Sequence, residues 1–258
     1  AYRLWLQAQR YHALPAMARA TVNKVARHVP PTLLGHGGAR AGWARSVVRF
    51  SELPEEEAFL TSNSLFAQPE LAALLSPELW PDIDDLLGEH LEIYSDNYLD
   101  DAINRMCLAD VRFLLPARKL ACADGAGMAS SVEVRLPFVD PVVFRAAFSL
   151  SGDHKVGPVS TKMALQEVGR AWLPARALRR ARPSSLPLKS WARKELRPLV
   201  DEVLLQGELV RSGFLQSEAL QDLVRQGTTG EKDNSKQIWQ LLSLELWYRQ
   251  ADGAGVSL

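Results

Sequence analysis

The sequence predicts a mainly α-helical protein, and three observations support this class. Apolar residues recur at three- to five-residue steps along much of the chain, which is the spacing of an amphipathic helix. Proline followed by glutamate opens several of these stretches, as the fixed φ of proline and the helix dipole both favour. Strand signals are nearly absent, because only residues 132–139 have a strand-like composition.

The first half of the chain divides into helices separated by proline and glycine. Residues 14–29 have an amphipathic pattern that Pro30-Pro31 stops. Residues 33–42 are glycine-rich, but a phosphate loop needs a preceding strand and a following Lys-Ser/Thr, so a linker is favoured. Three proline–glutamate pairs predict further helix starts, at residues 54–55, 69–70 and 77–78.

The second half continues the helical pattern. Ser95-Asp96 predicts the cap of a helix whose buried face would run from Leu99 to Phe113. That face includes Asp110, which should therefore have a partner, and Leu115-Pro116 predicts the end of the helix. Further helices are expected over residues 142–150, 163–172 and, with polar turns between them, 191–250.

Composition excludes several classes of function. The chain has 258 residues, 47% of them hydrophobic and 23% charged, which suits a soluble globular protein of one or two domains. Lys+Arg and Asp+Glu balance at 30 each, so nothing indicates nucleic-acid binding. No apolar run reaches the ~20 residues that span a membrane. Cys107 and Cys122 lack metal-site spacing and indicate a reducing, cytoplasmic setting. The chain begins in mid-pattern without Met, which predicts that it continues from something longer.

Two charged stretches are candidate sites. Asp124, Glu133, Arg135 and Asp140 lie among small or apolar residues, where charges are usually paired because desolvating a lone one is costly. A structural salt-bridge corner and the wall of a functional site are both open interpretations. A basic cluster follows and is either a solvated helix end or an anion site, since guanidinium groups bind phosphate bidentately. It comprises Arg176, Arg179, Arg180 and Arg182.

The order of these features resembles the C-terminal synthetase domain of glutamine-dependent asparagine synthetases. The specific part is Glu133-Val134-Arg135-Leu136-Pro137-Phe138-Val139-Asp140, which is similar to the family's E-x-R-x-P-F-L-D. Asp110, Leu115-Pro116, Asp124 and Met128-Ala129 precede it in the family's order. Downstream, the resemblance continues through Lys155, Lys162, Leu173-Pro174, the segment from Arg180 to Trp191, and Trp239 with Trp247. It covers roughly residues 95–250.

The resemblance implies a fold and a reaction. The chain would be the helical C-terminal portion of an α/β synthetase domain of the adenine-nucleotide α-hydrolase-like (ATP pyrophosphatase) type. Residues 1–95 would continue from a nucleotide-binding core, residues 96–252 would be the family's helical region, and 253–258 a disordered tail. The enzyme would use ATP and Mg²⁺ to adenylate a carboxylate such as aspartate, and would transfer to it ammonia released from glutamine.

The resemblance also implies roles for single residues and for missing parts. Lys162 and Arg182 would be catalytic, and with Lys155 and Arg180 would bind ATP and pyrophosphate. Asp124, Glu133, Arg135 and Asp140 would wall the site or orient substrate. The S-G-G-x-D-S pyrophosphate loop and the glutaminase with its Cys nucleophile are expected upstream of residue 1, together with most ligands of ATP and Mg²⁺. No metal ligand is therefore expected in this chain, and a homodimer is one expected arrangement.

This sequence departs from the family pattern at the phosphate-facing positions. It has Asp124-Gly125-Ala126-Gly127-Met128 where the family has D-R-x-S-M, Cys122 where a basic residue is usual, and Arg182 where the family has lysine. Arg keeps the charge but not the compact ammonium geometry. Three functional hypotheses are compatible with this sequence. They are a divergent amide ligase, an intramolecular amide-forming relative of the β-lactam or lasso-peptide type, and a catalytically inactive helical interaction subunit of the same fold.

Overall fold

The computed structural model describes residues 2–28, 38–95, 99–158, 160–178 and 186–253, and it confirms the mainly α prediction. Within these ranges every regular element is helical and no strand forms. The chain divides into two compact units, one made of Ala1–Asn63 and Leu87–Arg180, the other of Ser64–Leu86 and Ala181–Leu258. The predicted division at residue 95 rests on the family's pattern and stays a prediction.

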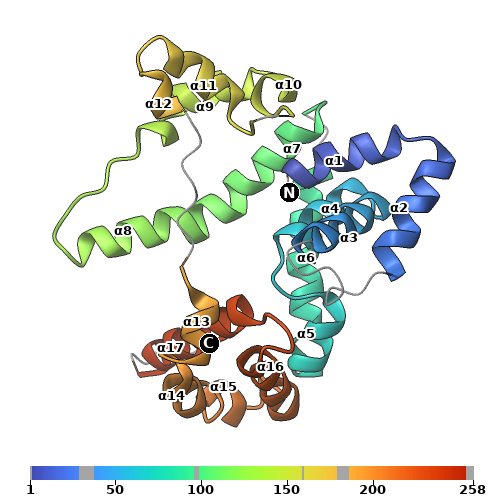
Figure 1. Ribbon diagram of the computed structural model, residues 1–258. Coiled ribbons are helices and arrows are strands. Elements are labelled where there is room, and N and C mark those ends of the chain that lie inside the picture. Colours follow the sequence, from blue (N-terminus) through green and yellow to red (C-terminus); the bar gives the residue numbers. More distant parts are fainter. Residues whose placement is uncertain (1, 29–37, 96–98, 159, 179–185, 254–258) are drawn as a thin grey trace. The chain divides into compact units, whose positions relative to one another are not determined.

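The first unit contains α1 to α4, the second half of α6, and all elements from α7 to α12 (Figure 1). Helix α3 packs against α1, α2 and α4, and α10 packs against both α7 and α11. The bounds are α1 (Tyr2–His12), α2 (Ala16–His28), α3 (Gly38–Glu52), α4 (Glu55–Asn63), α6 (Trp80–Ser95), α7 (Ala102–Ala109), η3 (Asp110–Leu120), α8 (Ala121–Met128), η4 (Pro137–Val139), α9 (Pro141–Phe148), α10 (Gly152–Lys155), α11 (Met163–Arg170) and α12 (Ala175–Leu178).

The core of this unit lies where α1, α3, α4, α6 and α7 meet. The tilted rings of Phe59 and Tyr94 pack there with centroids 5.4 Å apart, beside the buried Ile103 and Met106 of α7. Burying side chains of this size stabilises the fold by about 1.5–3 kcal/mol each. Glu55 binds the same helices together, because it accepts hydrogen bonds from Trp5 (3.1 Å), Tyr94 (2.8 Å) and Arg105 (2.9 Å). The helix start predicted at Pro54-Glu55 is confirmed.

The prediction that Leu115-Pro116 ends a helix is wrong. Helix α7 runs without interruption through η3 into α8, and Figure 1 shows the three as one long helical run. The segment η3 is π-helical with Pro116 inside it, and the Ala121 N–H donates to the Pro116 carbonyl five residues earlier. The wider π turn relieves the clash between a proline ring and the carbonyl four residues back, which normally breaks an α-helix.

The strand-like composition of residues 132–139 does not produce a strand. Ser131 adopts a positive φ of 55°, which turns the chain sharply after α8. Residues 132–136 are irregular, and residues 137–139 form a 3₁₀ turn that Pro137 opens. No other described segment offers a paired edge to this stretch, and proline cannot donate to a ladder, so the β-branched residues have no sheet to join.

The second unit is a helical cluster around Leu204, Leu220, Ile238 and Leu242, all buried. A single antiparallel bridge between Leu75 and Leu215 ties its early and late segments, with Gln216 N–H donating to the Leu74 carbonyl at 2.8 Å. Its remaining elements are α5 (Gln68–Leu74), η2 (Pro77–Leu79), α13 (Leu188–Arg193), α14 (Arg197–Leu199), η5 (Val200–Leu204), α15 (Glu208–Arg211), α16 (Ser217–Thr229) and α17 (Ser235–Gly253).

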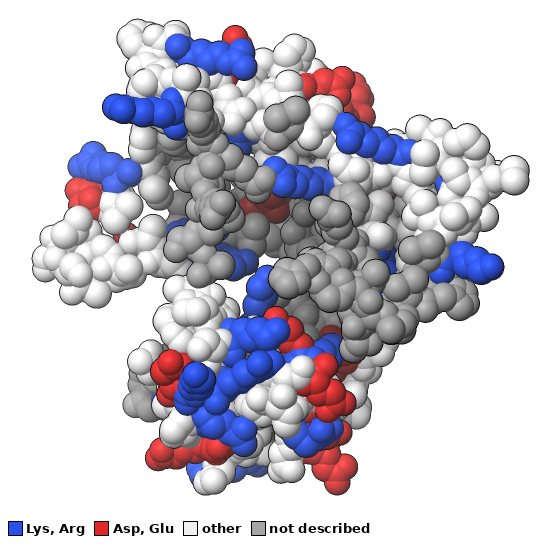
Figure 2. Space-filling view, viewed as in Figure 1, with Lys and Arg blue, Asp and Glu red and all other residues white. Residues whose placement is uncertain are grey.

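The surface of the second unit carries charges of both signs side by side. Figure 2 shows Lys and Arg next to Asp and Glu over the face it presents. Arg225, for example, pairs with both Asp222 at 3.2 Å and Glu231 at 3.0 Å. Water screens such exposed pairs and they contribute little, so the core sets the stability of this unit. In the described part of the chain, none of the helices has the length and apolar character needed to cross a bilayer.

Candidate functional site

Lys155 is the best-defined of the predicted phosphate-binding residues. It ends α10, where it is half-buried, and its Nζ donates a hydrogen bond to Oδ1 of Asn104 on α7. The same ammonium lies 5.0 Å from the centroid of the Phe148 ring, in cation–π geometry. Two independent contacts therefore fix the end of a side chain that would otherwise sample many rotamers.

Asn104 is the centre of a buried polar network that sequence reasoning missed. Its Nδ2 donates to Asp101 Oδ2 at 2.6 Å and to the Leu150 carbonyl at 3.0 Å, while its Oδ1 accepts from Lys155. Every polar atom of this buried amide thus has a partner, as burial requires. The network joins α7, Leu150 in the turn between α9 and α10, and α10 itself into one rigid corner.

Asp101 is the true cap of α7, which corrects the prediction of a cap at Ser95-Asp96. Its Oδ1 accepts from the Asn104 N–H at 2.7 Å, and its Oδ2 accepts from the Gly152 N–H at 3.3 Å. A Cβ at Gly152 would lie 2.6 Å from Asp101 Oδ1, so glycine lets α10 approach α7. The signal was present in the sequence as an Asp three residues before a polar helical residue.

The electrostatics of this corner favour neutral or paired groups. Burial lowers the pKa of Lys155, although the nearby Cys107 and Asp101 act in the opposite direction. Burial raises the pKa of Cys107, which keeps it a thiol rather than a nucleophilic thiolate. Asp110 has the partner that its place on the core side predicted, since Tyr2 Oη donates to its Oδ2 at 2.5 Å. Burial raises the pKa of both members of that pair.

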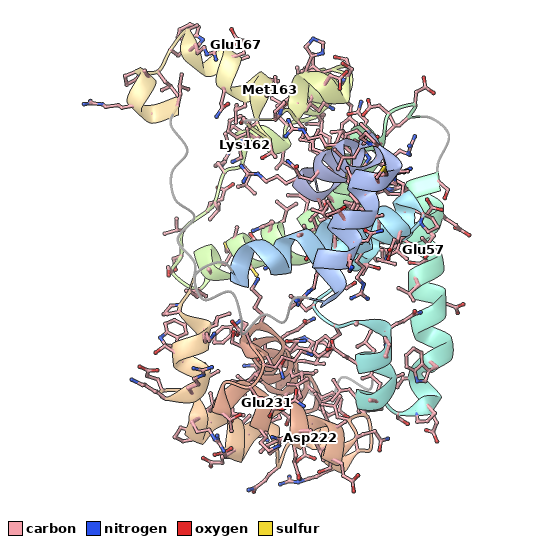
Figure 3. The ribbon with its side chains drawn as sticks, turned by 45° about the vertical axis from the view of Figure 1, so that its right-hand side comes forward. Glu57, Lys162, Met163, Glu167, Asp222 and Glu231 are labelled. Carbon is pink, nitrogen blue, oxygen red and sulfur yellow. The ribbon has the colours of Figure 1, made fainter. Side chains whose placement is uncertain are left out.

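Lys162 lies beyond the turn that follows α10, immediately before α11 (Figure 3). Its side chain is exposed and makes no ion pair with any described residue, while its backbone N–H donates to Ser160 Oγ at 3.1 Å. The Gly157 N–H donates to the Ser160 carbonyl at 2.8 Å and closes the turn. Lys155 ends α10 and Lys162 directly precedes α11, which packs against α10, so one ammonium is anchored and the other is open to solvent.

Glu133 and Arg135 form the predicted ion pair but not the predicted buried corner. Arg135 Nε lies 3.0 Å from Glu133 Oε1, and its Nη2 donates to Oε2 at 3.1 Å. Their side chains are 82% and 71% exposed, for Arg135 and Glu133 respectively. The ion pair is therefore solvent-exposed. Its two parallel N–O contacts account for it, and the cost of burying a lone charge does not.

The two aspartates of the predicted site wall have different surroundings. Asp140 caps α9, because its Oδ1 accepts from the Val142 N–H at 2.7 Å and Pro141 opens the helix. Asp124 is exposed on α8 and has no ion pair within the described residues. In that part of the chain, no hydrogen bond or ion pair joins these two, Glu133 or Arg135 to Lys155 or Lys162. Arg180 and Arg182 lie outside the described residues.

The glycines that replace the family's Arg and Ser have opposite steric surroundings. A Cβ at Gly127 would lie 2.6 Å from the Val132 carbonyl oxygen and 2.7 Å from Val134 Cγ2. The Val132 N–H donates to the Gly127 carbonyl at 2.9 Å, so the returning chain is held against this turn of α8. At Gly125, by contrast, a Cβ would meet nothing within 4 Å. A side chain at position 127 would clash with backbone in this conformation, whereas a Cβ at position 125 would meet open space.

The described residues offer no metal centre. Among them, no group of three or more His, Cys, Asp or Glu side chains comes together in a way that could hold an ion. Cys107 and Cys122 are both free thiols.

Comparison with known proteins identifies the family. A family model described as asparagine synthase matches residues 2–249. A Mycobacterium tuberculosis protein provisionally named a glutamine-hydrolysing asparagine synthetase is 26% identical over 258 residues, covering 96% of this chain and 36% of that protein. The glutamine-hydrolysing asparagine synthetase 1 of Bacillus subtilis is 23% identical over 252 residues, covering 96% and 37%. No solved structure matches the chain. The chain spans little more than a third of these relatives' length, and it belongs to the asparagine synthase family.

Proposed function

We propose that this chain is the helical, cation-bearing part of an ATP-dependent amide ligase of the asparagine synthase type. One observation supports it above the others: Lys155, at a lysine position of the family pattern, is locked to α7 by Asn104 and to α9 by Phe148. A structural surface lysine does not need such support. A lysine that must meet a developing charge does, because electrostatic catalysis depends on groups fixed before the reaction begins.

The proposed chemistry has two steps. An oxygen of the substrate carboxylate attacks the α-phosphorus of ATP, the bond from that phosphorus to the bridging oxygen breaks, and pyrophosphate leaves. Ammonia then attacks the acyl carbon of the adenylate, the carbon–oxygen bond breaks, AMP leaves with its electron pair, and the attacking nitrogen releases a proton to give the amide. Negative charge accumulates on the departing pyrophosphate in the first step. Lys155, Lys162, Arg180 and Arg182 would meet it, while Asp124, Glu133, Arg135 and Asp140 would line or brace the site.

The cofactors and partners of the complete enzyme belong to the same proposal. ATP and Mg²⁺, an aspartate-like carboxylate, and ammonia released from glutamine by a separate glutaminase portion follow from the family. The described residues contain no carboxylate cluster, so the proposal assigns Mg²⁺ no ligand in this chain. A cytoplasmic homodimer stays part of the proposal, and the two free cysteines suit a reducing setting.

Carboxylate-dependent exchange of labelled pyrophosphate into ATP tests the adenylation step in the complete synthetase that contains this chain. Lys155→Met and Lys162→Met keep side-chain length but remove the charge, and each should slow exchange by ~10²-fold, the usual effect of losing one preorganised contact. Lys119→Met removes an exposed lysine of the same unit and should leave the rate unchanged. Absence of carboxylate-dependent exchange in the unmodified enzyme would reject the proposal.

A non-catalytic interaction subunit is the second candidate, and the exposed apolar residues of the α8–α12 region favour it. Phe138 and Val142 are each 65% exposed, and Trp172 is 83% exposed. Surface apolar residues of this size often mark contact with another protein. The exchange experiment separates the candidates, because an interaction subunit would give no exchange and would be unaffected by either lysine substitution.

A further inference from the structure

Asp101 and Lys155 are opposite charges that are joined through a single amide. Neither side chain makes an ion pair with any residue that the structure describes. Lys155 Nζ donates to Asn104 Oδ1, and Asn104 Nδ2 donates in turn to Asp101 Oδ2 at 2.6 Å. The three side chains therefore form a continuous hydrogen-bonded series in which every donor faces an acceptor.

The neighbours of the Asn104 amide fix its direction. An ammonium can only donate, so Lys155 needs the amide oxygen, whereas the Leu150 carbonyl and the Asp101 carboxylate can only accept. The opposite orientation would set the amide oxygen against two acceptors and its N–H groups against Lys155. Asn104 is only 6% exposed, so water does not compensate for a wrong orientation. The amide is therefore held in the direction that connects the carboxylate to the ammonium.

Asp101 makes more contacts than a helix cap requires. A cap needs one acceptor oxygen, and Asp101 Oδ1 fulfils that role by accepting from the Asn104 N–H at 2.7 Å. Its second oxygen accepts from Asn104 Nδ2 and also from the Gly152 N–H at 3.3 Å. Asp140 caps α9 through one oxygen, which accepts from the Val142 N–H at 2.7 Å. Capping therefore leaves the second oxygen of Asp101 unexplained.

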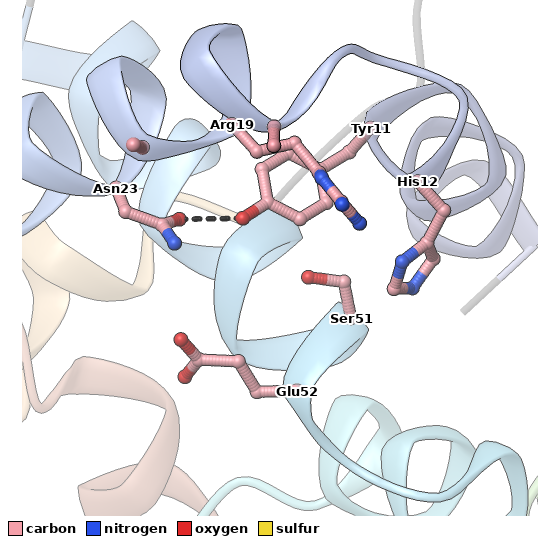
Figure 4. A pocket seen from close by; sticks show the side chains of 8 residues that line it. Tyr11, His12, Arg19, Asn23, Ser51 and Glu52 are labelled. Atoms are coloured by element: carbon pink, nitrogen blue, oxygen red, sulfur yellow. Dashed lines mark hydrogen bonds between the residues drawn. The ribbon is translucent and has the colours of Figure 1, made fainter.

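Another amide of the same unit has a neutral partner. Asn23 lines a surface depression of about 370 Å³ between α1, α2 and α3, where its Oδ1 accepts from Tyr11 Oη at 2.7 Å (Figure 4). That contact joins two uncharged groups, so its loss would change packing without changing the charge on a lysine. Asn23 is therefore a matched control for Asn104.

We propose that Asp101 is a positioning residue, which acts through Asn104 to keep the Lys155 ammonium charged and in place for the departing pyrophosphate. Because Lys155 meets pyrophosphate only in the proposed function, this role rests on that function. Asp101 itself touches no substrate. A carboxylate polarises the amide that it binds, and the polarised amide oxygen becomes a stronger acceptor for an ammonium.

The charges around Lys155 make Asp101 the one that matters at neutral pH. Burial lowers the pKa of Lys155, and Cys107 and Asp101 act in the opposite direction. Burial also raises the pKa of Cys107, so this thiol stays neutral. The Phe148 ring of α9 adds a cation–π contact, and His154 of α10 is paired with a serine hydroxyl. Within its described residues, α11 adds no charge that shifts the pKa of Lys155.

The titration of Lys155 tests this role without ATP. NMR of isotopically labelled lysine side chains in the full chain, with the signal assigned by Lys155→Arg, follows the loss of its proton. The pKa of Lys155 should fall in Asp101→Asn, because one of the two groups that oppose burial has lost its charge. Asp153→Asn removes the same charge from an exposed acid of α10 and should leave that pKa unchanged. Asn23→Ala should also leave it unchanged.

Asp101→Ser separates capping from positioning. Serine is a good N-cap, so its hydroxyl can still accept from the Asn104 N–H, but it has neither a second oxygen nor a charge. Far-UV circular dichroism should therefore show the helix content of the parent, while the pKa of Lys155 should again fall. An unchanged pKa of Lys155 in both folded variants, Asp101→Asn and Asp101→Ser, would overturn the proposal.

Pyrophosphate exchange in the synthetase that contains this chain measures the consequence for the reaction. At neutral and alkaline pH, Asp101→Asn should slow exchange by ~10-fold or more, since misplacing a reacting contact by about 1 Å can cost ~10²-fold. Lowering the pH protonates Lys155 again and should recover part of the rate. A loss by the same factor at every pH would indicate a structural role alone and would overturn the positioning role. Absence of exchange in the parent would instead reject the proposed function, and the NMR titration would still decide whether Asp101 acts on Lys155.

Discussion

Glu245 is the most consequential buried charge in the second unit, and replacing it should destabilise that unit strongly. Its side chain is fully buried in α17, where Oε1 accepts from the Glu208 N–H at 2.8 Å and Oε2 from the Leu209 N–H at 3.0 Å. Arg249 Nε lies 2.6 Å from Oε1. The carboxylate therefore satisfies the first N–H groups of α15 and one arginine together.

Glu245→Ala removes all three contacts and leaves a cavity. Arg249 is 37% exposed and can be hydrated once Glu245 is removed, so the cost comes mainly from the backbone of α15. Two orphaned N–H groups would cost about 1–3 kcal/mol each. Gly207 supports the estimate: a Cβ there would lie 2.4 Å from Glu245 Oε2, so the surrounding backbone is closely fitted to this carboxylate.

Urea unfolding followed by circular dichroism measures the loss. Glu245→Gln should fall between the parent and Glu245→Ala, since its amide oxygen can accept one N–H while its nitrogen faces a second donor. Glu202→Ala is the matched control, because Glu202 is exposed in η5 and should change the free energy of unfolding by no more than ~0.5 kcal/mol. A loss below ~1 kcal/mol for Glu245→Ala would refute the assignment of Glu245 as a buried structural charge.

Three further predictions concern the first unit. Gly125→Ala should raise the free energy of unfolding by ~0.5–1 kcal/mol, because alanine has the higher helix propensity. Gly127→Ala should lower the free energy of unfolding by ~1–3 kcal/mol, because its Cβ would overpack against Val132. Equal effects of the two substitutions in denaturant unfolding would contradict the geometry. Asn104→Ala should slow carboxylate-dependent pyrophosphate exchange by releasing Lys155, and should change the pH profile of the rate, which a purely structural loss would not do. For Glu55, burial raises the pKa, but the hydrogen bonds from Arg105, Tyr94 and Trp5 outweigh burial and hold it below its ordinary value of 4.5. Its stabilisation should therefore be complete above that value and be lost as pH falls through the depressed folded pKa, and Glu55→Gln should remove this acid dependence from unfolding curves measured between neutral and acidic pH.

The helical class could be read from the sequence because amphipathic spacing and proline–glutamate starts are local signals. The start of α4 at Glu55 is one such case. The end predicted at Pro116 failed because a local preference of proline was overridden by a π-helical turn that accommodates it. The cap of α7 was misplaced because the helix begins only after Asp101, whose contacts with Asn104 and Gly152 are seen only in the folded chain, while Asp96 lies outside the described residues.

The candidate site could be predicted only as a set of residue types. Glu133 and Arg135 are two residues apart, so their pairing was visible, but their exposure depends on how little of the chain covers residues 129–140. The partner of Lys155 is 51 residues away in Asn104, and that of Asp110 is 108 residues away in Tyr2. Contacts at such separations arise from the packing of α1, α7 and α10, and no pattern in a single sequence identifies them.

The two glycine departures in α8 have different physical origins, and this bears on whether the site is active. At position 127 a side chain is excluded by the Val132 backbone, so loss of the family's serine accompanies a turn that brings residues 132–134 back against the helix. Glycine there is a requirement of the fold and says nothing about lost activity. At position 125 no such requirement exists, because a Cβ would meet open space. We propose that the missing cation at Gly125 is the departure that bears on function, and Gly125→Arg in the synthetase that contains this chain tests it. Faster pyrophosphate exchange would indicate that a phosphate contact is restored. An unchanged rate in an enzyme that already exchanges would indicate that Lys155 and Lys162 suffice.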